Sequence, residues 1–296
     1  MVQDQATRRL PAQSSQRALT GSTLRKLRLG VIEVVLVALC LAMLLPLVLT
    51  LVYSVTPESD IFNWPITWIP THPNWANYVE PFVKEHFQLY FLNSIVVATA
   101  QTLGSLLFAS MAGYGLAKFS FPGRTLIFVF MLSTLMMPAQ VILVPLYVLV
   151  RQLGWVNSFQ GLIVPGLVDS FGIFLMRQFA LSIPDEYLQA ARIDGASELT
   201  IYRAIVLPML LPAISALCIF TFTGSWNQFL WPLVVVDKFN LWTVPLGMTQ
   251  YMDAMVAPRW GELMATSIIA LVPILVVFLA AEKQFVQGAA ISGLKG

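Results

Sequence analysis

The sequence has 296 residues, of which 57% are hydrophobic and 11% are charged, and its mean hydropathy is +0.76. So apolar a chain excludes a soluble domain with an ordinary hydrated surface and predicts an integral membrane protein. The net charge of +2 excludes the strongly basic surface of a nucleic-acid-binding protein. The two cysteines, Cys40 and Cys218, lie in apolar runs, which excludes a disulfide framework or a thiolate metal site.

The first predicted helix follows a polar segment, residues 1–30. This segment carries the basic side chains Arg8, Arg9, Arg17, Arg25, Lys26 and Arg28. The apolar run from Val31 to Val55 is too long for the hydrophobic region of a signal peptide, and no small-residue cleavage site ends it. We therefore expect a retained transmembrane helix that a basic cytoplasmic tail precedes.

Six segments are long and apolar enough to cross a bilayer core of about 30 Å, which needs about 20 helical residues. In chain order they are 31–55, 91–117, 125–150, 161–179, 209–236 and 262–281. The fourth is the least apolar, because polar and helix-breaking residues interrupt it: Pro165, Gly166, Asp169 and Ser170. A chain without this span would have five spans and termini on opposite sides of the membrane.

The basic residues distinguish between five and six spans. With six spans and a cytoplasmic N-terminus, all seventeen Lys and Arg lie on the cytoplasmic side except Lys84, Arg151, Lys238 and Arg259. The positive-inside rule therefore favours six spans with both termini in the cytoplasm. The outer loops, 56–90 and 237–260, are rich in Trp and Tyr, and we expect these aromatic side chains to anchor the chain at the level of the lipid headgroups.

A polar stretch, residues 182–208, interrupts the apolar chain on the cytoplasmic side. Ser182 followed by Asp185 resembles a capping box, so a short helix is predicted from Ser182 to about Asp194. Gly195 is suited to a bend with positive φ, and Ser197 to the cap of a second short helix that ends near Pro208. The small residues at the bend suit close approach by a partner's backbone, but an amphipathic linker on the membrane surface fits equally well.

The spacing within this stretch resembles the EAA loop of ABC-importer permeases, whose pattern is Glu-Ala-Ala, three residues, Gly, nine residues, then Ile-x-Leu-Pro. Here Gln189-Ala190-Ala191 precedes Gly195 by three residues, and Ile205-Val206-Leu207-Pro208 follows after nine more. Five further segments are similar to the second permease of the maltose-type carbohydrate-uptake group: "FLNSIVVA" (91–98), "GYGLAKFSFPGR" (113–124), "FGIFLMRQFALSIP" (171–184), "ARIDGAS" (191–197) and "WNQFLWPL" (226–233).

The resemblance implies an all-α integral membrane protein with the six-helix core of a type I (MetI-like) ABC importer permease. That core would occupy residues 31–282, with the coupling loop at 182–208 and a cytoplasmic tail at 283–296. The loop is expected to dock on a cytoplasmic ATPase through Glu186, Gln189, Ala190, Ala191, Asp194, Gly195, Leu207 and Pro208. Gln189 departs from the usual Glu and loses a charge-assisted contact, which Glu186 one turn earlier could supply. The glycine-containing tail is expected to be flexible and to reach between the ATPases.

The chain contains no P-loop, no paired metal ligands and no catalytic triad. A transporter instead needs polar groups at membrane depth. The candidates for a translocation path are Gln140, Asp169, Trp226, Asn227 and Gln228. For any one of them, hydrogen bonding between helices is favoured over contact with the substrate. In the maltose-type family the other permease holds most of the substrate.

The predicted function is that of a non-catalytic permease subunit of a bacterial inner-membrane importer for a carbohydrate. Its partners would be a second homologous permease, two ATPase subunits and an extracytoplasmic sugar-binding protein. The chain itself would need no cofactor or metal, because ATP and Mg would bind to the ATPases. The alternative is a self-contained secondary transporter or channel, which would need internal repeats and a buried proton or cation relay.

Overall fold

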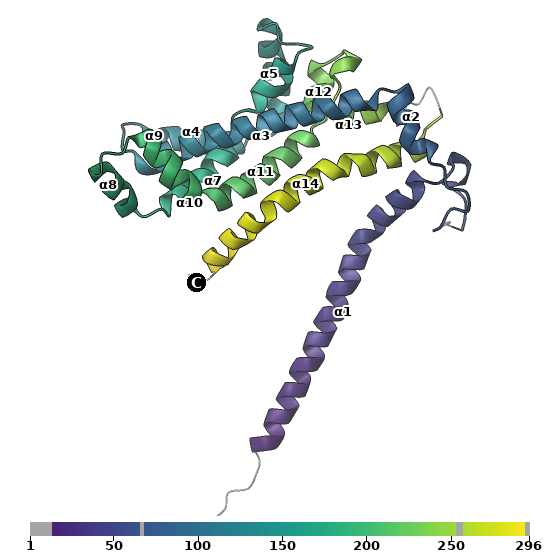
Figure 1. Ribbon diagram of the computed structural model, residues 1–296, viewed down its shortest axis with the longest axis horizontal. Helices are drawn as coiled ribbons and strands as arrows, with labels where there is room; N and C mark the ends of the chain where they lie inside the picture. Colours follow the sequence, from purple (N-terminus) through teal and green to yellow (C-terminus); the bar gives the residue numbers. More distant parts are fainter. Residues whose placement is uncertain (1–13, 66–67, 253–256, 294–296) are drawn as a thin grey trace, which may run out of the picture. The chain divides into compact units, whose positions relative to one another are not determined.

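The structure is a computed structural model that describes residues 14–65, 68–252 and 257–293, with the backbone alone for 14–27 and 285–293. In these ranges every regular element is a helix (Figure 1). The chain forms two compact units, residues 1–52 and 53–296. The first unit holds most of α1 (Ser14–Ser54), in which large apolar side chains such as Val34 and Met43 are exposed. Such a helix suits a lipid environment rather than water.

Four helical segments are long and apolar enough to span a membrane. They are Arg28–Ser54 within α1, α3 (Phe87–Lys118), the segment Phe159–Leu181, and Trp260–Gln284 within α14 (Trp260–Gly293). The segment Phe159–Leu181 contains α6 (Phe159–Ile163), η2 (Val164–Gly166) and α7 (Ser170–Leu181). These segments match the first, second, fourth and sixth predicted spans.

The third and fifth predicted spans are bent. α4 (Arg124–Leu135) and α5 (Ala139–Gln152) meet at 105°, and the helical run Glu198–Met209 meets α11 (Leu211–Trp226) at 76°. The described residues therefore contain six spans if each bent pair counts as one. The first bend has a clear cause: Pro138 takes an extended conformation and lacks the amide hydrogen that would continue the helix.

The fifth predicted span, 209–236, is not one helix. α11 ends at Trp226, and α12 (Leu230–Val235) follows after three residues. The turn closes because the amides of Asn227 and Gln228 donate to the carbonyls of Thr223 and Ser225. The prediction of a continuous helix was wrong here because the chain turns at these two polar residues and a separate helix follows.

α3 is the central element of the second unit and packs against α7 and α11, while α11 also packs against α14 (Figure 1). Near the C-terminal end of α3, five side chains are fully buried in one apolar cluster: Met176, Leu188, Ile201, Val206 and Leu217. Close approach of α3 and α7 depends on Gly113, where an added Cβ would lie 2.6 Å from Met176 Cβ and 2.7 Å from the Arg177 amide nitrogen. Small residues are the usual means of such packing between membrane helices.

Polar side chains fix the outer loops. The loop elements are η1 (Glu58–Asp60), α2 (Ala76–Lys84), η4 (Phe239–Leu241), α13 (Val244–Gly247) and η5 (Met248–Met252). The Glu58 carboxylate accepts hydrogen bonds from the amides of Trp260 and Gly261, both at 3.0 Å, and so caps the start of α14. Arg259 Nη1 lies 2.8 Å from a carboxylate oxygen of Glu85.

The C-terminal segment is more regular than the sequence indicated. α14 continues through the expected tail as far as Gly293, so the backbone of residues 283–293 is helical. Gly288 lowers helix propensity by only about 1 kcal/mol, which a helix of this length tolerates. Residues 294–296 lie outside the described part of the chain.

The close packing of α3 against α7 can be tested with a matched pair of variants. Gly113→Ala places its methyl group against the backbone of α7, and overpacking of this kind should lower the free energy of unfolding by about 1–3 kcal/mol. Gly115→Ala, two residues away in the same helix, meets no atom within 4 Å and should be neutral or stabilising. Thermal unfolding of both variants in the same detergent checks this, and equal midpoints would contradict the packing account.

Candidate coupling surface and translocation path

The first short helix of the cytoplasmic stretch, α8 (Asp185–Ile193), begins later than predicted. Ser182 does not cap it, because its hydroxyl donates to the carbonyl of Phe179 at 2.7 Å and closes the last turn of α7. Pro184 then takes an extended conformation at the N-cap of α8, with φ −61° and ψ 135°. A residue before proline is disfavoured in the helical region, so Ile183 separates the two helices.

The rest of this stretch follows the sequence prediction. α8 ends at Ile193, Gly195 has φ +78°, and the Ser197 hydroxyl accepts a hydrogen bond from the Thr200 amide at the start of α9 (Glu198–Ile201). A π-helical turn, η3 (Tyr202–Val206), and α10 (Leu207–Met209) complete the second short helix. The unit of α8, the bend and α9 to α10, residues 185–209, is called the coupling unit below.

Lys118, the last residue of α3, holds the beginning of the coupling unit. Its side chain is 7% exposed, and its Nζ donates to the carbonyl of Ile183 at 2.5 Å and to Asp185 Oδ1 at 2.6 Å. Leu188 lies one turn further along α8 and is 1% exposed in the apolar cluster. An ammonium group with two oxygen acceptors is a strong link, because hydrogen bonds to charged groups are stronger than neutral ones.

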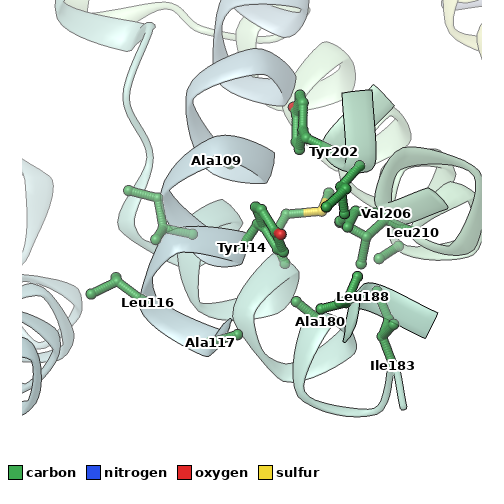
Figure 2. Close-up of a cluster of buried hydrophobic side chains, with 14 of the residues drawn as sticks. Ala109, Tyr114, Leu116, Ala117, Ala180, Ile183, Leu188, Tyr202, Val206 and Leu210 are labelled. Carbon is green, nitrogen blue, oxygen red and sulfur yellow. The ribbon is translucent and has the colours of Figure 1, made fainter. Parts of the chain in front are cut away.

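Two tyrosines connect α3 to the second short helix. Tyr114 donates to Glu198 Oε2 at 3.3 Å, and Tyr202 shares a 2.7 Å hydrogen bond with Ser110. The rings of Tyr114 and Tyr202 lie 6.0 Å apart, beside Leu188 and Val206 (Figure 2). Ser110, Tyr114 and Lys118 are four residues apart, so one face of α3 makes all of these contacts.

An ion pair joins the two short helices across the bend. Arg192 Nε lies 2.6 Å from Glu198 Oε1, and both side chains are substantially exposed. The hydrogen bond that Arg192 donates to the Glu198 carboxylate raises the pKa of the Arg192 guanidinium above its ordinary value. The ion pair contributes little stability by itself at this exposure, but it links α8 to α9 across the bend.

The outward face of α8 contains Glu186, Gln189, Ala190 and Ile193, all exposed. These positions are spaced by three or four residues, so they form one helix face, with Asp194 and Gly195 exposed just beyond it. Ile193 is 86% exposed and adds an apolar side chain to this otherwise polar face. Sequence reasoning missed Ile193, although its spacing from Gln189 was a usable signal.

Two of the predicted coupling residues face the other way. Ala191 and Leu207 pack against the buried apolar cluster, so their side chains are not part of the exposed surface, whereas Pro208 is exposed. Gln189 does lie on the surface, and Glu186 lies on the same face one turn earlier. The structure thus places the predicted compensating carboxylate where a partner could reach both side chains.

All five predicted path residues line one or more of three neighbouring cavities. The largest, about 430 Å³, lies between α3, α7 and α11 and is lined by Asp169 and Gln228 among others; we call it the mid-span cavity. A second, about 360 Å³, is lined by Gln140, Asn227 and Gln228, and a third, also about 360 Å³, by Trp226 and Asn227. Asn227 and Gln228 each line two of the three, so the turn after α11 connects them.

Trp226 has a different position from the one expected. It is 2% exposed, its ring stacks on Phe222 at 5.8 Å, and Phe91 meets it edge to face at 5.6 Å. The aromatic neighbours cover the indole, so this placement does not support stacking on a sugar. Trp226 instead packs α11 against α3.

Gln101 is a cavity residue that sequence reasoning missed. It is 4% exposed, lines the mid-span cavity, and its Nε2 donates to the carbonyl of Leu162 at 2.8 Å. Gly166 makes room for it, since a Cβ there would lie 2.6 Å from the Gln101 amide. A polar amide within an apolar span is the signal that could have identified it.

Residues 105–289 match the family described as "Binding-protein-dependent transport system inner membrane component". The chain is 34% identical over 263 residues to the arabinooligosaccharides transport system permease protein AraQ of Bacillus subtilis, covering 87% of this chain and 92% of that protein. It is also 34% identical over 263 residues to the sn-glycerol-3-phosphate transport system permease protein UgpE of Pectobacterium atrosepticum, covering 86% and 94%.

Solved structures agree on the fold. A chain of a bacterial ABC transporter involved in the import of the acidic polysaccharide alginate superimposes with a TM-score of 0.78 at 20% identity. The match covers 94% of this chain and 100% of that chain. A second structure, of the bacterial alginate ABC transporter in complex with its alginate pentasaccharide-bound periplasmic protein, gives a TM-score of 0.59 at 15% identity and covers 91% and 96%.

The anchoring of α8 can be tested by replacing Lys118. Lys118→Met removes both hydrogen bonds, so local opening of residues 183–193 should become easier by about 1.5–3 kcal/mol and their amides should exchange faster. Lys84→Met is the control, because Lys84 makes an ion pair of the same 2.6 Å length to Glu80 but is 57% exposed. Unchanged exchange in the Lys118 variant would contradict the anchoring.

Proposed function

The chain belongs to the family of binding-protein-dependent transport system inner membrane components, and from this premise we propose that it is one permease subunit of an ATP-driven importer for a carbohydrate. The similarity to an arabinooligosaccharide permease over most of both chains supports a sugar as the solute. The subunit is not an enzyme; hydrolysis of ATP belongs to its partners. Family membership also argues against a self-contained secondary transporter, and no observation favours that alternative.

The assembly that we propose contains a second homologous permease, two ATPase subunits and a sugar-binding protein on the outer side. Both termini and the coupling unit would face the cytoplasm, as the distribution of Lys and Arg indicates. The exposed α8 face with Gln189, Ala190 and Ile193 supports an ATPase contact there, because it carries the Gln-Ala-Ala part of the motif and an exposed apolar side chain that a partner could cover. The large apolar surface of α1 supports contact with lipid or with the second permease.

The observation that carries the proposal is the attachment of the exposed α8 face to a single long helix. Lys118 and Tyr114 connect the coupling unit to α3, which has 32 residues, contains no proline and is therefore about 48 Å long. A push on α8 by a closing ATPase would pass into α3 through charged and tyrosyl hydrogen bonds. The Lys118 side chain itself is 7% exposed, so this end of the charged link is shielded from water.

The opposite end of α3 holds the outer loop. Asn93 Nδ2 donates to the carbonyls of Asn240 and Trp242, both at 2.9 Å, and Ser94 Oγ accepts from the Val244 amide at 2.7 Å. This loop borders the third cavity through Val244, Pro245 and Met248. Movement of α3 would therefore move the loop on the side where a loaded binding protein delivers its solute.

The bend of the coupling unit offers a test of its role. Gly195→Val places a β-branched side chain at φ +78°, which should strain the bend and lower solute uptake and ATPase stimulation by the binding protein at least several-fold. Gly154→Val is the matched control, because Gly154 has φ +72° and, like Gly195, has no atom within 4 Å of an added Cβ. It lies in the loop after α5, and an equal defect in both variants would argue against a specific coupling role.

The composition of the assembly is tested by affinity purification. The tagged chain is extracted from its native membrane in mild detergent, and co-purifying proteins are identified by mass spectrometry. We expect a second permease and an ATPase in comparable amounts. Recovery of the chain alone, or as a homo-oligomer, under conditions that preserve other importers would contradict the proposed function.

A further inference from the structure

Sequence similarity does not assign the charge of the solute. The chain is equally identical, at 34%, to a permease for arabinooligosaccharides, which are neutral, and to one for sn-glycerol 3-phosphate, which is an anion. The alginate transporter that shares its fold carries an acidic polymer. The lining of the mid-span cavity provides the missing information, since a site for anions and a site for neutral sugars need different side chains.

The mid-span cavity is polar and carries one formal charge. Its polar lining consists of the Asp169 carboxylate, the amides of Gln101 and Gln228, and the hydroxyls of Thr221 and Ser225. No Lys, Arg or His is among the described residues that line it. Phe171 and Phe220, whose rings meet edge to face at 6.1 Å, add exposed aromatic surface at the same cavity.

The start of α7 is the one place in this cavity where an anion would ordinarily bind. Free amides and the helix dipole at a helix N-terminus attract phosphate and carboxylate groups. Here the chain's own carboxylate occupies that position: Asp169 accepts from the amides of Phe171 at 3.2 Å and Gly172 at 2.9 Å. A phosphate entering the cavity would meet Asp169 instead of the amides, and like charges repel strongly where water is scarce.

Hydrogen-bonding capacity remains for a hydroxylated solute. The Ser225 hydroxyl is buried and has no partner among the residues that the structure describes. The bond to Leu162 fixes the Gln101 amide and leaves its carbonyl oxygen as an acceptor, and the Asp169 carboxylate has lone pairs beyond the two that cap α7. A buried hydroxyl without a partner is unfavourable, and a hydrogen bond to a solute hydroxyl would offset that cost.

We propose that the mid-span cavity is a solute subsite that accepts the neutral, hydroxyl-bearing part of a sugar, and that Asp169 excludes phosphate and carboxylate groups from it. This inference rests on the proposed function. It departs from the family expectation that the other permease holds the solute, since it gives this subunit a direct contact. It also places the chain with importers of neutral oligosaccharides rather than with those of glycerol phosphate.

The test uses the charge selectivity of thiol labelling. Cys40 and Cys218 are first replaced, and Ser225→Cys then places a single thiol in the cavity. Membranes that contain the assembled complex are treated with three methanethiosulfonate reagents. One reagent is cationic, one is anionic, and one is neutral and carries a glucose unit. Rates are divided by those for a free thiol in solution. We expect the glucose reagent to react and the anionic reagent to be roughly tenfold slower.

Two further variants complete the comparison. In the first, Asp169→Asn is combined with Ser225→Cys, which keeps a side chain that can cap α7 but removes the charge. This change should restore the rate at which the anionic reagent labels the thiol. Thr249→Cys, an exposed position in the outer loop, should show no preference among the reagents. Equal rates for the anionic and neutral reagents at Ser225→Cys, or no effect of Asp169→Asn, would overturn the exclusion.

Failure of the glucose reagent to label Ser225→Cys, while Thr249→Cys reacts, would overturn the subsite itself. Partner recovery is measured separately on the same membranes. A complete complex with the wrong selectivity therefore overturns this inference alone. Recovery of the chain without partners in the affinity purification overturns the proposed function.

Discussion

The structure depends on the connection between α3 and the coupling unit. Lys118, Tyr114 and Ser110 lie on one face of α3 and bond to both short helices of that unit. The Ser110–Tyr202 hydrogen bond is buried beside the apolar cluster that contains Leu188 and Met176, whereas Asp185 and Glu198 are largely exposed. Because α3 also holds the outer loop through Asn93 and Ser94, a single unbroken helix connects the two sides of the membrane.

The need to satisfy backbone hydrogen bonds explains where the regular structure of the spans is interrupted. A membrane helix satisfies its own backbone, so every break must be repaired locally or line a cavity. The break before α7 is repaired by Asp169, and the turn after α11 by bonds from Asn227 and Gln228 to carbonyls one turn back. Both breaks border the mid-span cavity. The polar residues there cap or close backbone breaks and also line the proposed path. Neither a structural role nor a path role alone therefore accounts for them.

The sequence predicted much of this arrangement and missed identifiable parts. Apolar length located the spans, and the motif spacing located the bend at Gly195, because both depend on local physics. The capping box at Ser182 failed because the hydroxyl had a nearer acceptor at the end of α7. Hydropathy could not reveal the bend between α4 and α5, since the helices on both sides of it are apolar. The burial of Trp226 and Ala191 and the exposure of Ile193 depend on tertiary packing, which no single helix specifies.

The central claim is that the coupling unit and the outer loop move as one body through α3. Spin labels at Tyr187 and Phe239, both exposed, with Cys40 and Cys218 replaced, would report the distance between them by double electron–electron resonance. The account predicts the same distance distribution in the nucleotide-free complex and in the ATP-bound complex with its binding protein, while a label at Tyr187 moves relative to its counterpart on the second permease. A change of several ångströms within this subunit would contradict the account, because α3 would then bend or slip instead of transmitting the movement.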